Sequence, residues 1–465
     1  MKAPALFLAA VAVLSGSLRA DDFPNVIFIN ADDLTHSDLS IYGGQAKTPN
    51  FDRLASEGMV FDACFQAAPM CSPTRHNLYT GIYPVKSGAY PNHTFAKEGT
   101  KSIVHHLEPH GYRVALSGKR HISPTTVFPF EYSGEKNPDM EVIETLMKES
   151  KEAGTPFCLF ACSNEPHTPW NLGDPSAYPP KEIELPKYFA DTPATREGMS
   201  RYLAEITYYD GQIGEILDLL DKHDLAENTI VMASSEQGSS FPFAKWTLYD
   251  AGLKTALVVR WPGKIEAGSR TDAMVEYVDV VPTILEALGA EAIAPLDGKS
   301  FFPVLAGETD QHTDFTFGIM TTRGIINGSE TFGIRSARSR DYLYVRNLTP
   351  EIKFTNACTQ SPEFLSWVRK AEGGAKKAAR LVEKYHHRPA EELYEVSGEW
   401  HNWKNLADSP EHASIKKELS GQLDAWMADQ GDLGQETEAN AYEHQSRSRN
   451  KKKKAAKKPK EESTK

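Results

Sequence analysis

The sequence is poor in cysteine and in long apolar runs. Its 465 residues include only five cysteines, an odd number that cannot all pair within the chain. Cys158 and Cys162 lie in an apolar, strand-like run, so we expect small buried thiols there rather than disulfides. After the first twenty residues, no apolar run is long enough to span a bilayer, so we expect no transmembrane anchor.

Basic residues are also scarce, except at the C-terminal end. Residues 446–465 hold ten Lys/Arg and two Glu; residues 21–445 hold 39 basic and 61 acidic residues. A body this acidic excludes a nucleic-acid partner as the expected function. It also argues against binding a long polyanion over an extended surface, although a local basic pocket remains possible.

The first twenty residues are typical of a secretory signal. Lys2 gives the charged start, 6–14 form the apolar stretch, and Ala20 is the small residue before the expected cleavage site. The apolar stretch is too short to cross a membrane. We therefore expect a secreted or periplasmic protein.

Up to about residue 310, short apolar runs alternate with segments of helical period. Apolar residues recur at helical spacing in 201–223. This alternation predicts an α/β fold with a central, mostly parallel sheet. The strand-like runs occur at 25–33, 112–118, 156–162, 228–235 and 256–263.

The pattern changes after residue 310. Residues 332–347 alternate in the manner of an antiparallel hairpin, 363–385 form a Lys/Ala-rich helical segment, and another helix is expected near 410–428. From 431 the chain is polar and aromatic-poor, which is typical of disorder. We divide the chain into a signal peptide (1–20), a catalytic domain (21–310), a smaller C-terminal α+β subdomain with an antiparallel sheet (311–430) and a disordered basic tail (431–465).

One short motif points to a specific chemistry. Cys71-Ser72-Pro73-Thr74-Arg75 is followed by Thr80-Gly81, and this segment resembles the signature of the sulfatase family. The resemblance implies that a formylglycine-generating enzyme oxidises Cys71 to formylglycine during maturation. Thr74 departs from the Ser or Ala that the family usually has at this position.

Acidic and amide side chains at two other segments suggest a metal site. Asp32 and Asp33 end an apolar run, and adjacent carboxylates there need a counter-charge such as a hard divalent cation. Residues 234–238, Ser-Ser-Glu-Gln-Gly, resemble the family's metal turn, with Glu236 and Gln237 in place of the usual Asp and His or Asn. Both keep oxygen donors, and the flexible Ca²⁺ shell tolerates the longer side chains. The resemblance implies one Ca²⁺ per chain, held by Asp32, Asp33, Cys71 as formylglycine, Glu236 and Gln237.

Basic and histidine side chains occur in three further matching segments. Lys119 and His121 lie in a segment that resembles the second sulfatase signature, His167 lies in Glu-Pro-His-Thr-Pro, and Lys245 precedes Trp-Thr-Leu-Tyr. The resemblance implies that both lysines bind sulfate oxygens. It also implies that one histidine, assigned as His121, accepts a proton from the hydrated formylglycine and the other, assigned as His167, protonates the leaving group. These two assignments are interchangeable on sequence grounds.

Arg75 is expected to orient the hydrated formylglycine and to balance the carboxylates. The predicted catalytic residues are therefore Cys71, Arg75, Lys119, His121, His167 and Lys245. Six other basic residues are considered only as candidates for the specificity side of the pocket: His36, His76, Arg323, His386, His387 and Arg388.

The resemblance extends from about residue 24 to about 430. Residues 118–124, 241–250 and 388–396 look most like the sulfamidase (N-sulfoglucosamine sulfohydrolase) branch. The implied fold is the alkaline-phosphatase-like α/β sandwich with a smaller C-terminal subdomain. The implied function is hydrolysis of sulfate esters or N-sulfate on a saccharide.

Two alternatives remain open. A phosphonate or phosphate ester hydrolase can share the fold and the formylglycine nucleophile. A non-catalytic glycan-binding relative is suggested by the change to Glu236 and Gln237. The presence of every other expected polar group argues against the second alternative, and calcium binding without turnover of any sulfated sugar would favour it.

Overall fold

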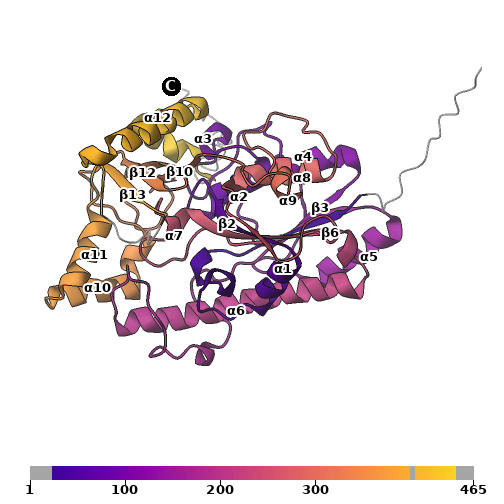
Figure 1. Cartoon of the computed structure of the whole chain (residues 1–465), viewed down its shortest axis with the longest axis horizontal. Helices are drawn as coiled ribbons and strands as arrows, with labels where there is room; N and C mark the ends of the chain where they lie inside the picture. Colours follow the sequence, from indigo (N-terminus) through magenta and orange to yellow (C-terminus); the bar gives the residue numbers. More distant parts are fainter. Residues whose placement is uncertain (1–22, 398–403, 447–465) are drawn as a thin grey trace, which may run out of the picture.

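A nine-stranded sheet forms the centre of the computed structural model, which describes residues 23–397 and 404–446 (Figure 1). The strand order is β4-β3-β5-β1-β6-β7-β2-β8, and β9 also pairs with β2. All pairs are parallel except those of β7, which runs against both neighbours. The strands are β1 (Asn25–Asn30), β2 (Met59–Phe65), β3 (Arg113–Gly118), β4 (Glu131–Ser133), β5 (Phe157–Cys162), β6 (Thr229–Ser234), β7 (Lys254–Arg260), β8 (Ser269–Thr271) and β9 (Val275–Glu276).

Helices cover both faces of this sheet (Figure 1). Along β1, Ile27 and Ile29 pack into one hydrophobic core, whereas Val26 and Phe28 pack into the other. Successive side chains of a strand point to opposite faces, so a strand buried on both faces is apolar throughout. The helices of this part are α1 (Pro49–Glu57), α2 (Cys71–Thr80), α3 (Pro84–Ser87), α4 (Ile103–Leu107), α5 (Met140–Ala153), α6 (Pro193–Lys222), α7 (Asp250–Leu253), α8 (Val280–Ala287) and α9 (Phe302–Leu305).

The C-terminal part contains a four-stranded antiparallel sheet of order β10-β11-β12-β13 beside the large sheet (Figure 1). The hairpin predicted over 332–347 corresponds to β11 and β12. The α/β class and the second, antiparallel sheet are confirmed. The elements are β10 (Thr316–Thr321), β11 (Gly333–Arg338), β12 (Tyr342–Asn347), β13 (Glu391–Glu395), α10 (Pro362–Glu372), α11 (Lys376–His386), α12 (Ala413–Gln430) and α13 (Gln435–Asn440).

Two helix boundaries differ from the prediction. The helix expected from 201 begins at Pro193, because the Thr192 hydroxyl accepts from the Thr195 amide and caps the start. The prediction of a single helix over 363–385 is wrong. The segment forms two helices, α10 and α11, which are separated by Gly373 and Gly374. Gly374 has a φ of +92°, which ends a regular helix.

The prediction of disorder from 431 is also wrong for residues 431–446. This segment contains α13 and is fixed to β11 by Arg335, a fully buried guanidinium that pairs with Asp432 and lies 2.9 Å from Glu438. A buried cation needs such partners, so they hold the segment in place. The basic part of the predicted tail, 447–465, and the predicted signal peptide lie outside the described residues.

All five cysteines are buried free thiols, as expected for Cys158 and Cys162. None of the helices in 23–397 and 404–446 is both long enough and apolar enough to cross a membrane.

Candidate active site

The predicted site residues follow the carboxyl ends of parallel strands. Asp32 and Asp33 come after β1, Lys119 after β3, His167 after β5 and Glu236 after β6. In parallel sheets these ends meet at one edge, where ligands commonly bind. The sheet order therefore explains why segments far apart in the sequence form one site.

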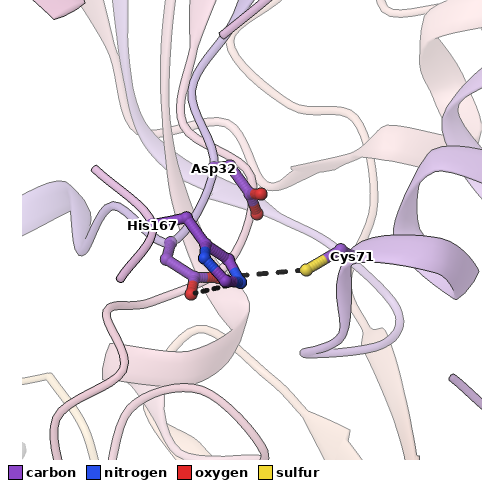
Figure 2. A group of neighbouring side chains, drawn as sticks. Asp32, Cys71 and His167 are labelled. Carbon is purple, nitrogen blue, oxygen red and sulfur yellow. Dashed lines mark hydrogen bonds and ion pairs between the residues drawn. The ribbon is translucent and has the colours of Figure 1, made fainter. Parts of the chain in front are cut away.

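Cys71 begins α2 and lies at the centre of this edge. Its side chain is buried, and its Sγ lies 3.2 Å from Lys245 Nζ and 3.3 Å from Gln237 Nε2. Figure 2 shows Cys71 turned toward Asp32 and His167. Burial raises the pKa of the Cys71 thiol to about 12, although Lys245 opposes this. The unmodified thiol is thus a poor nucleophile at neutral pH.

Two buried aspartates are each paired with a lysine. Lys119 forms an ion pair with Asp32, and Lys245 Nζ lies 2.5 Å from an Asp33 carboxylate oxygen. The Ser240 hydroxyl donates to the same carboxylate at 2.8 Å. Burial favours a raised Asp33 pKa, but the charges of Lys245 and His167 and the hydrogen bonds from Lys245 and Ser240 together hold that pKa below its usual value.

Glu236 pairs with Arg75. The Arg75 Nε lies 2.6 Å from a Glu236 carboxylate oxygen, and both side chains are 0% exposed. Arg75 also donates to the Lys119 carbonyl at 2.9 Å, which ties α2 to the loop after β3. Burial raises the Glu236 pKa, and Arg75 counteracts this. Of the four protein residues besides Cys71 that were predicted to bind Ca²⁺, Glu236 is the one engaged by an arginine.

The charges of the site balance. Asp32, Asp33 and Glu236 are matched by Lys119, Lys245 and Arg75. Because the carboxylates already have partners, a bound dication would leave the site with a surplus of positive charge. Such a surplus suits an anionic substrate.

The arrangement fits a hard metal ion. Ligand atoms of Asp32, Asp33, Cys71 and His167 lie within 4.8 Å of one another. Gln237 donates its amide to Asp33 at 2.6 Å, while its buried Oε1 has no hydrogen-bond partner among the described residues. The amide nitrogen, not the oxygen, thus faces Asp33 and Cys71, and a 180° turn of the amide would present to them the kind of oxygen donor that suits Ca²⁺.

The two predicted histidines occupy different positions. His167 Nε2 lies 3.7 Å from Asp33, and burial lowers the His167 pKa to about 4 although Asp33 opposes it. His121 Nε2 instead contacts His93 Nδ1 at 3.0 Å. Cys71 and both predicted histidines line a cavity of about 670 Å³. The loop between β10 and β11 contributes Gly324, Ile325 and Ile326 to its wall.

Sequence reasoning missed Ser240 and His93. Ser240 follows Gln237 closely, so its place in the metal turn was a usable signal, whereas nothing in the spacing marked His93. None of the six additional basic candidates is among the described residues that line the cavity. His76, for example, is buried within α2 and contacts the carbonyls of Ser72 and Ser123.

Comparisons with known proteins agree with this geometry. The family described as Sulfatase matches residues 24–290, more than half of the chain. The chain belongs to the sulfatase family. A second family, N-sulphoglucosamine sulphohydrolase, C-terminal, matches 238–349 and places this sulfatase close to the sulfamidase branch. Family membership makes it a sulfuric ester hydrolase.

Alignments with two relatives extend over most of this sulfatase and most of each relative. An ulvan-active sulfatase of Formosa agariphila is 33% identical over 91% of the chain and 83% of its own length. The N-sulphoglucosamine sulphohydrolase of Homo sapiens is 25% identical over 92% and 94%, respectively. A solved structure described as a complex with its substrate D-glucosamine-2-N,6-O-disulfate has a TM-score of 0.69 and 19% identity, covering 89% of this chain and 99% of its own. At this identity, the similarity to the solved structure shows a shared fold.

Proposed function

We propose that this sulfatase removes sulfate from O- or N-sulfated saccharides, with formylglycine at position 71 and one bound Ca²⁺. The observation that carries the proposal is the placement of Cys71 at the start of α2, with Lys245 and Gln237 on its sulfur and Asp33 beside both. The activities of the relatives, an ulvan-active sulfatase and an N-sulphoglucosamine sulphohydrolase, support a saccharide substrate.

Formylglycine, as its hydrate, would supply one hydroxyl to attack sulfur and a second hydroxyl to release sulfate. Asp32, Asp33, Glu236 and Gln237 would hold Ca²⁺, which supplies positive charge where negative charge develops. The remaining steps are assigned to the six proposed catalytic residues, Cys71, Arg75, Lys119, His121, His167 and Lys245.

The lysines and the arginine provide positioned charge. Lys245 lies 3.2 Å from the Cys71 sulfur, the atom that marks the position of the nucleophile, and is therefore suited to bind a sulfate oxygen during attack. Lys119 is 14% exposed and lines the cavity, so it can contact substrate. Arg75 is fully buried and is suited to fix the start of α2 rather than to contact the sugar.

The histidines are assigned to proton transfer. His167 lines the cavity beside Asp33, whose charge favours the protonated ring against the effect of burial, and we assign it to donate a proton to the bridging oxygen or nitrogen when an anionic substrate adds to the effect of Asp33. A correctly placed general acid contributes about 10²–10⁴ in rate. His121, which also lines the cavity, is assigned to accept the proton that is lost during sulfate release.

The test is peptide mass spectrometry over Cys71, on protein made with a formylglycine-generating enzyme, followed by a substrate panel. We expect a loss of about 18 Da at Cys71, the cysteine-to-formylglycine change. The panel contains ulvan oligosaccharides, N-sulfoglucosamine, glucosamine 6-sulfate and a phosphonate monoester. We expect sulfate release from a sulfated saccharide and much slower phosphonate hydrolysis.

The opposite results separate the alternatives. Faster turnover of the phosphonate would assign the site to phosphonate hydrolysis. An unmodified Cys71 from a competent host, together with sugar binding and no turnover, would favour the glycan-binding alternative. The N-terminal peptide of the same digest reports whether the exported protein begins after residue 20, as the proposed secretion to the periplasm or medium requires.

Gln237→Met is expected to weaken Ca²⁺ binding by about 10–100-fold, because it removes an amide oxygen at nearly constant volume. Gln237→Asn is the matched control, since it keeps the amide that relatives commonly use at this position. Calorimetric titration of the chelator-treated proteins with Ca²⁺ gives both affinities. Wild-type affinity in Gln237→Met would remove Gln237 from the ligand set.

A further inference from the structure

His93 and His121 form a contacting pair on one wall of the catalytic cavity. His93 Nδ1 lies 3.0 Å from His121 Nε2, the ring centroids are 4.8 Å apart, and both residues line the cavity. Their φ angles are +56° and +42°, in the left-handed region that residues other than glycine rarely adopt. Two neighbouring residues held in this conformation indicate that the fold imposes their positions.

The contact has a consequence for the tautomer of His121. Only one of the two facing nitrogens can carry the shared hydrogen. The other ring nitrogen of His121, Nδ1, is buried and has no hydrogen-bond partner among the described residues. If His121 donates from Nε2–H to His93 Nδ1, its own Nδ1 holds a lone pair. A proton accepted at that atom leaves the bond to His93 intact.

The two histidines are joined through the residue that follows Cys71. The Ser72 hydroxyl donates to the His121 carbonyl at 3.0 Å and lies 3.3 Å from the Thr94 amide, which donates to it. The Ala96 amide also donates to the Ser123 carbonyl at 2.8 Å. The loop that carries His93 is therefore tied at two points to the loop that carries His121.

The outer side of the His93 loop is held by residues 444–446, named here the C-terminal brace. The Ser446 amide donates to the His93 carbonyl, and the Ser446 hydroxyl donates to the Thr94 carbonyl, both at 2.8 Å. The Thr94 hydroxyl donates to the His444 carbonyl at 2.8 Å, and Thr94 pairs with Gln445 as an antiparallel bridge. Main-chain bonds on both sides thus fix the loop.

We propose that His93 is a positioning residue that sets the tautomer and orientation of His121, and that the C-terminal brace holds His93 in place. The proposal rests on the proposed function, because it takes His121 to be the group that accepts a proton during sulfate release. It extends the active site to a segment more than 350 residues beyond His93 in the chain. In enzymes that use a histidine as a base, a third group commonly orients the ring in this way.

His93→Asn and His93→Gly are compared in the mature, Ca²⁺-loaded enzyme. Both residues tolerate a positive φ, but only asparagine offers an acceptor near the position of Nδ1. We expect kcat to fall about 10–100-fold in His93→Gly, with a smaller change in KM, and to be largely restored in His93→Asn. Equal kcat in all three proteins, or equal losses in both variants, would overturn the role of His93.

A second readout does not depend on turnover. Nitrogen-15 spectra of labelled histidines report the His121 tautomer, which we expect to be Nε2–H in the wild type and in His93→Asn but mixed in His93→Gly. An unchanged tautomer in His93→Gly would overturn the proposal. Absence of wild-type turnover alongside the expected spectra would instead count against the proposed function.

Two chain lengths test the brace. A chain ending at Ser446 keeps the brace, whereas one ending at Asn440 removes it and retains α13 with the Glu438–Arg335 ion pair. On a mono- or disaccharide substrate we expect wild-type kcat for the first and a kcat close to that of His93→Gly for the second. Wild-type kcat in a folded chain ending at Asn440 would overturn the role of the brace. Thr94→Val, which removes one bond to His444, provides a milder variant if the shorter chain does not fold.

Discussion

Replacement of Cys71 by alanine is expected to lower sulfate release by a factor of about 10⁴ or more and to leave the protein folded. The reason is that position 71 supplies the nucleophile, while its thiol contributes little to packing beyond weak contacts with Asp33, Lys245 and Gln237. Initial rates on the preferred saccharide of the panel, with thermal unfolding measured in parallel, provide the test.

Cys158→Ala is the matched control for this variant. Cys158 is equally buried but lies in β5 within the hydrophobic core, so its loss removes a small apolar group. We expect it to cost some stability and to leave turnover near the wild-type rate. Appreciable turnover in Cys71→Ala, measured with protein free of wild-type enzyme, would contradict the assignment of the nucleophile.

The sheet edge of the site could be predicted from the sequence because its residues follow recognisable strands. Apolar runs end just before Asp32, Lys119 and Glu236, and parallel strands bring those ends together. The strand before Cys71, β2, was not among the predicted strands, so the motif was assigned to the site by its resemblance to the sulfatase signature and not by its place in the sheet. What the sequence could not provide was the pairing, such as Arg75 with Glu236 rather than with an aspartate.

The C-terminal segment shows why composition alone failed. Residues 431–446 are polar and aromatic-poor, which normally indicates disorder, yet Asp432 and Glu438 neutralise the buried Arg335. That arginine lies 97 residues before Asp432, so no local pattern connects them. The His93–His121 contact was hidden for the same reason, since it depends on how two loops meet. The break at Gly373 and Gly374 was a local signal and could have been read.

Glu236→Ala is expected to destabilise the protein by about 3–5 kcal/mol, because it leaves the fully buried Arg75 without its carboxylate partner. It is also expected to weaken Ca²⁺ binding, since Glu236 is proposed as a ligand. Denaturant unfolding of the calcium-free proteins isolates the first effect, and calorimetric titration measures the second. An unfolding midpoint near that of the wild type would contradict the structural role of the ion pair.

Two further variants test whether the stability loss in Glu236→Ala comes from removing a carboxylate or from the burial of the ion pair that it breaks. Glu236→Asp keeps a carboxylate at this position, so we expect it to recover calcium affinity and most of the stability. Asp221→Ala breaks an exposed ion pair with Arg53, in which the Asp221 side chain is 49% exposed, and should cost only about 0.2–1 kcal/mol. A similar loss in Glu236→Ala and Asp221→Ala would mean that burial adds nothing to the Arg75–Glu236 pair. A much larger loss of folding stability in Glu236→Ala would show that the buried carboxylate, through its pair with Arg75 in α2, stabilises the part of the fold that carries the nucleophile.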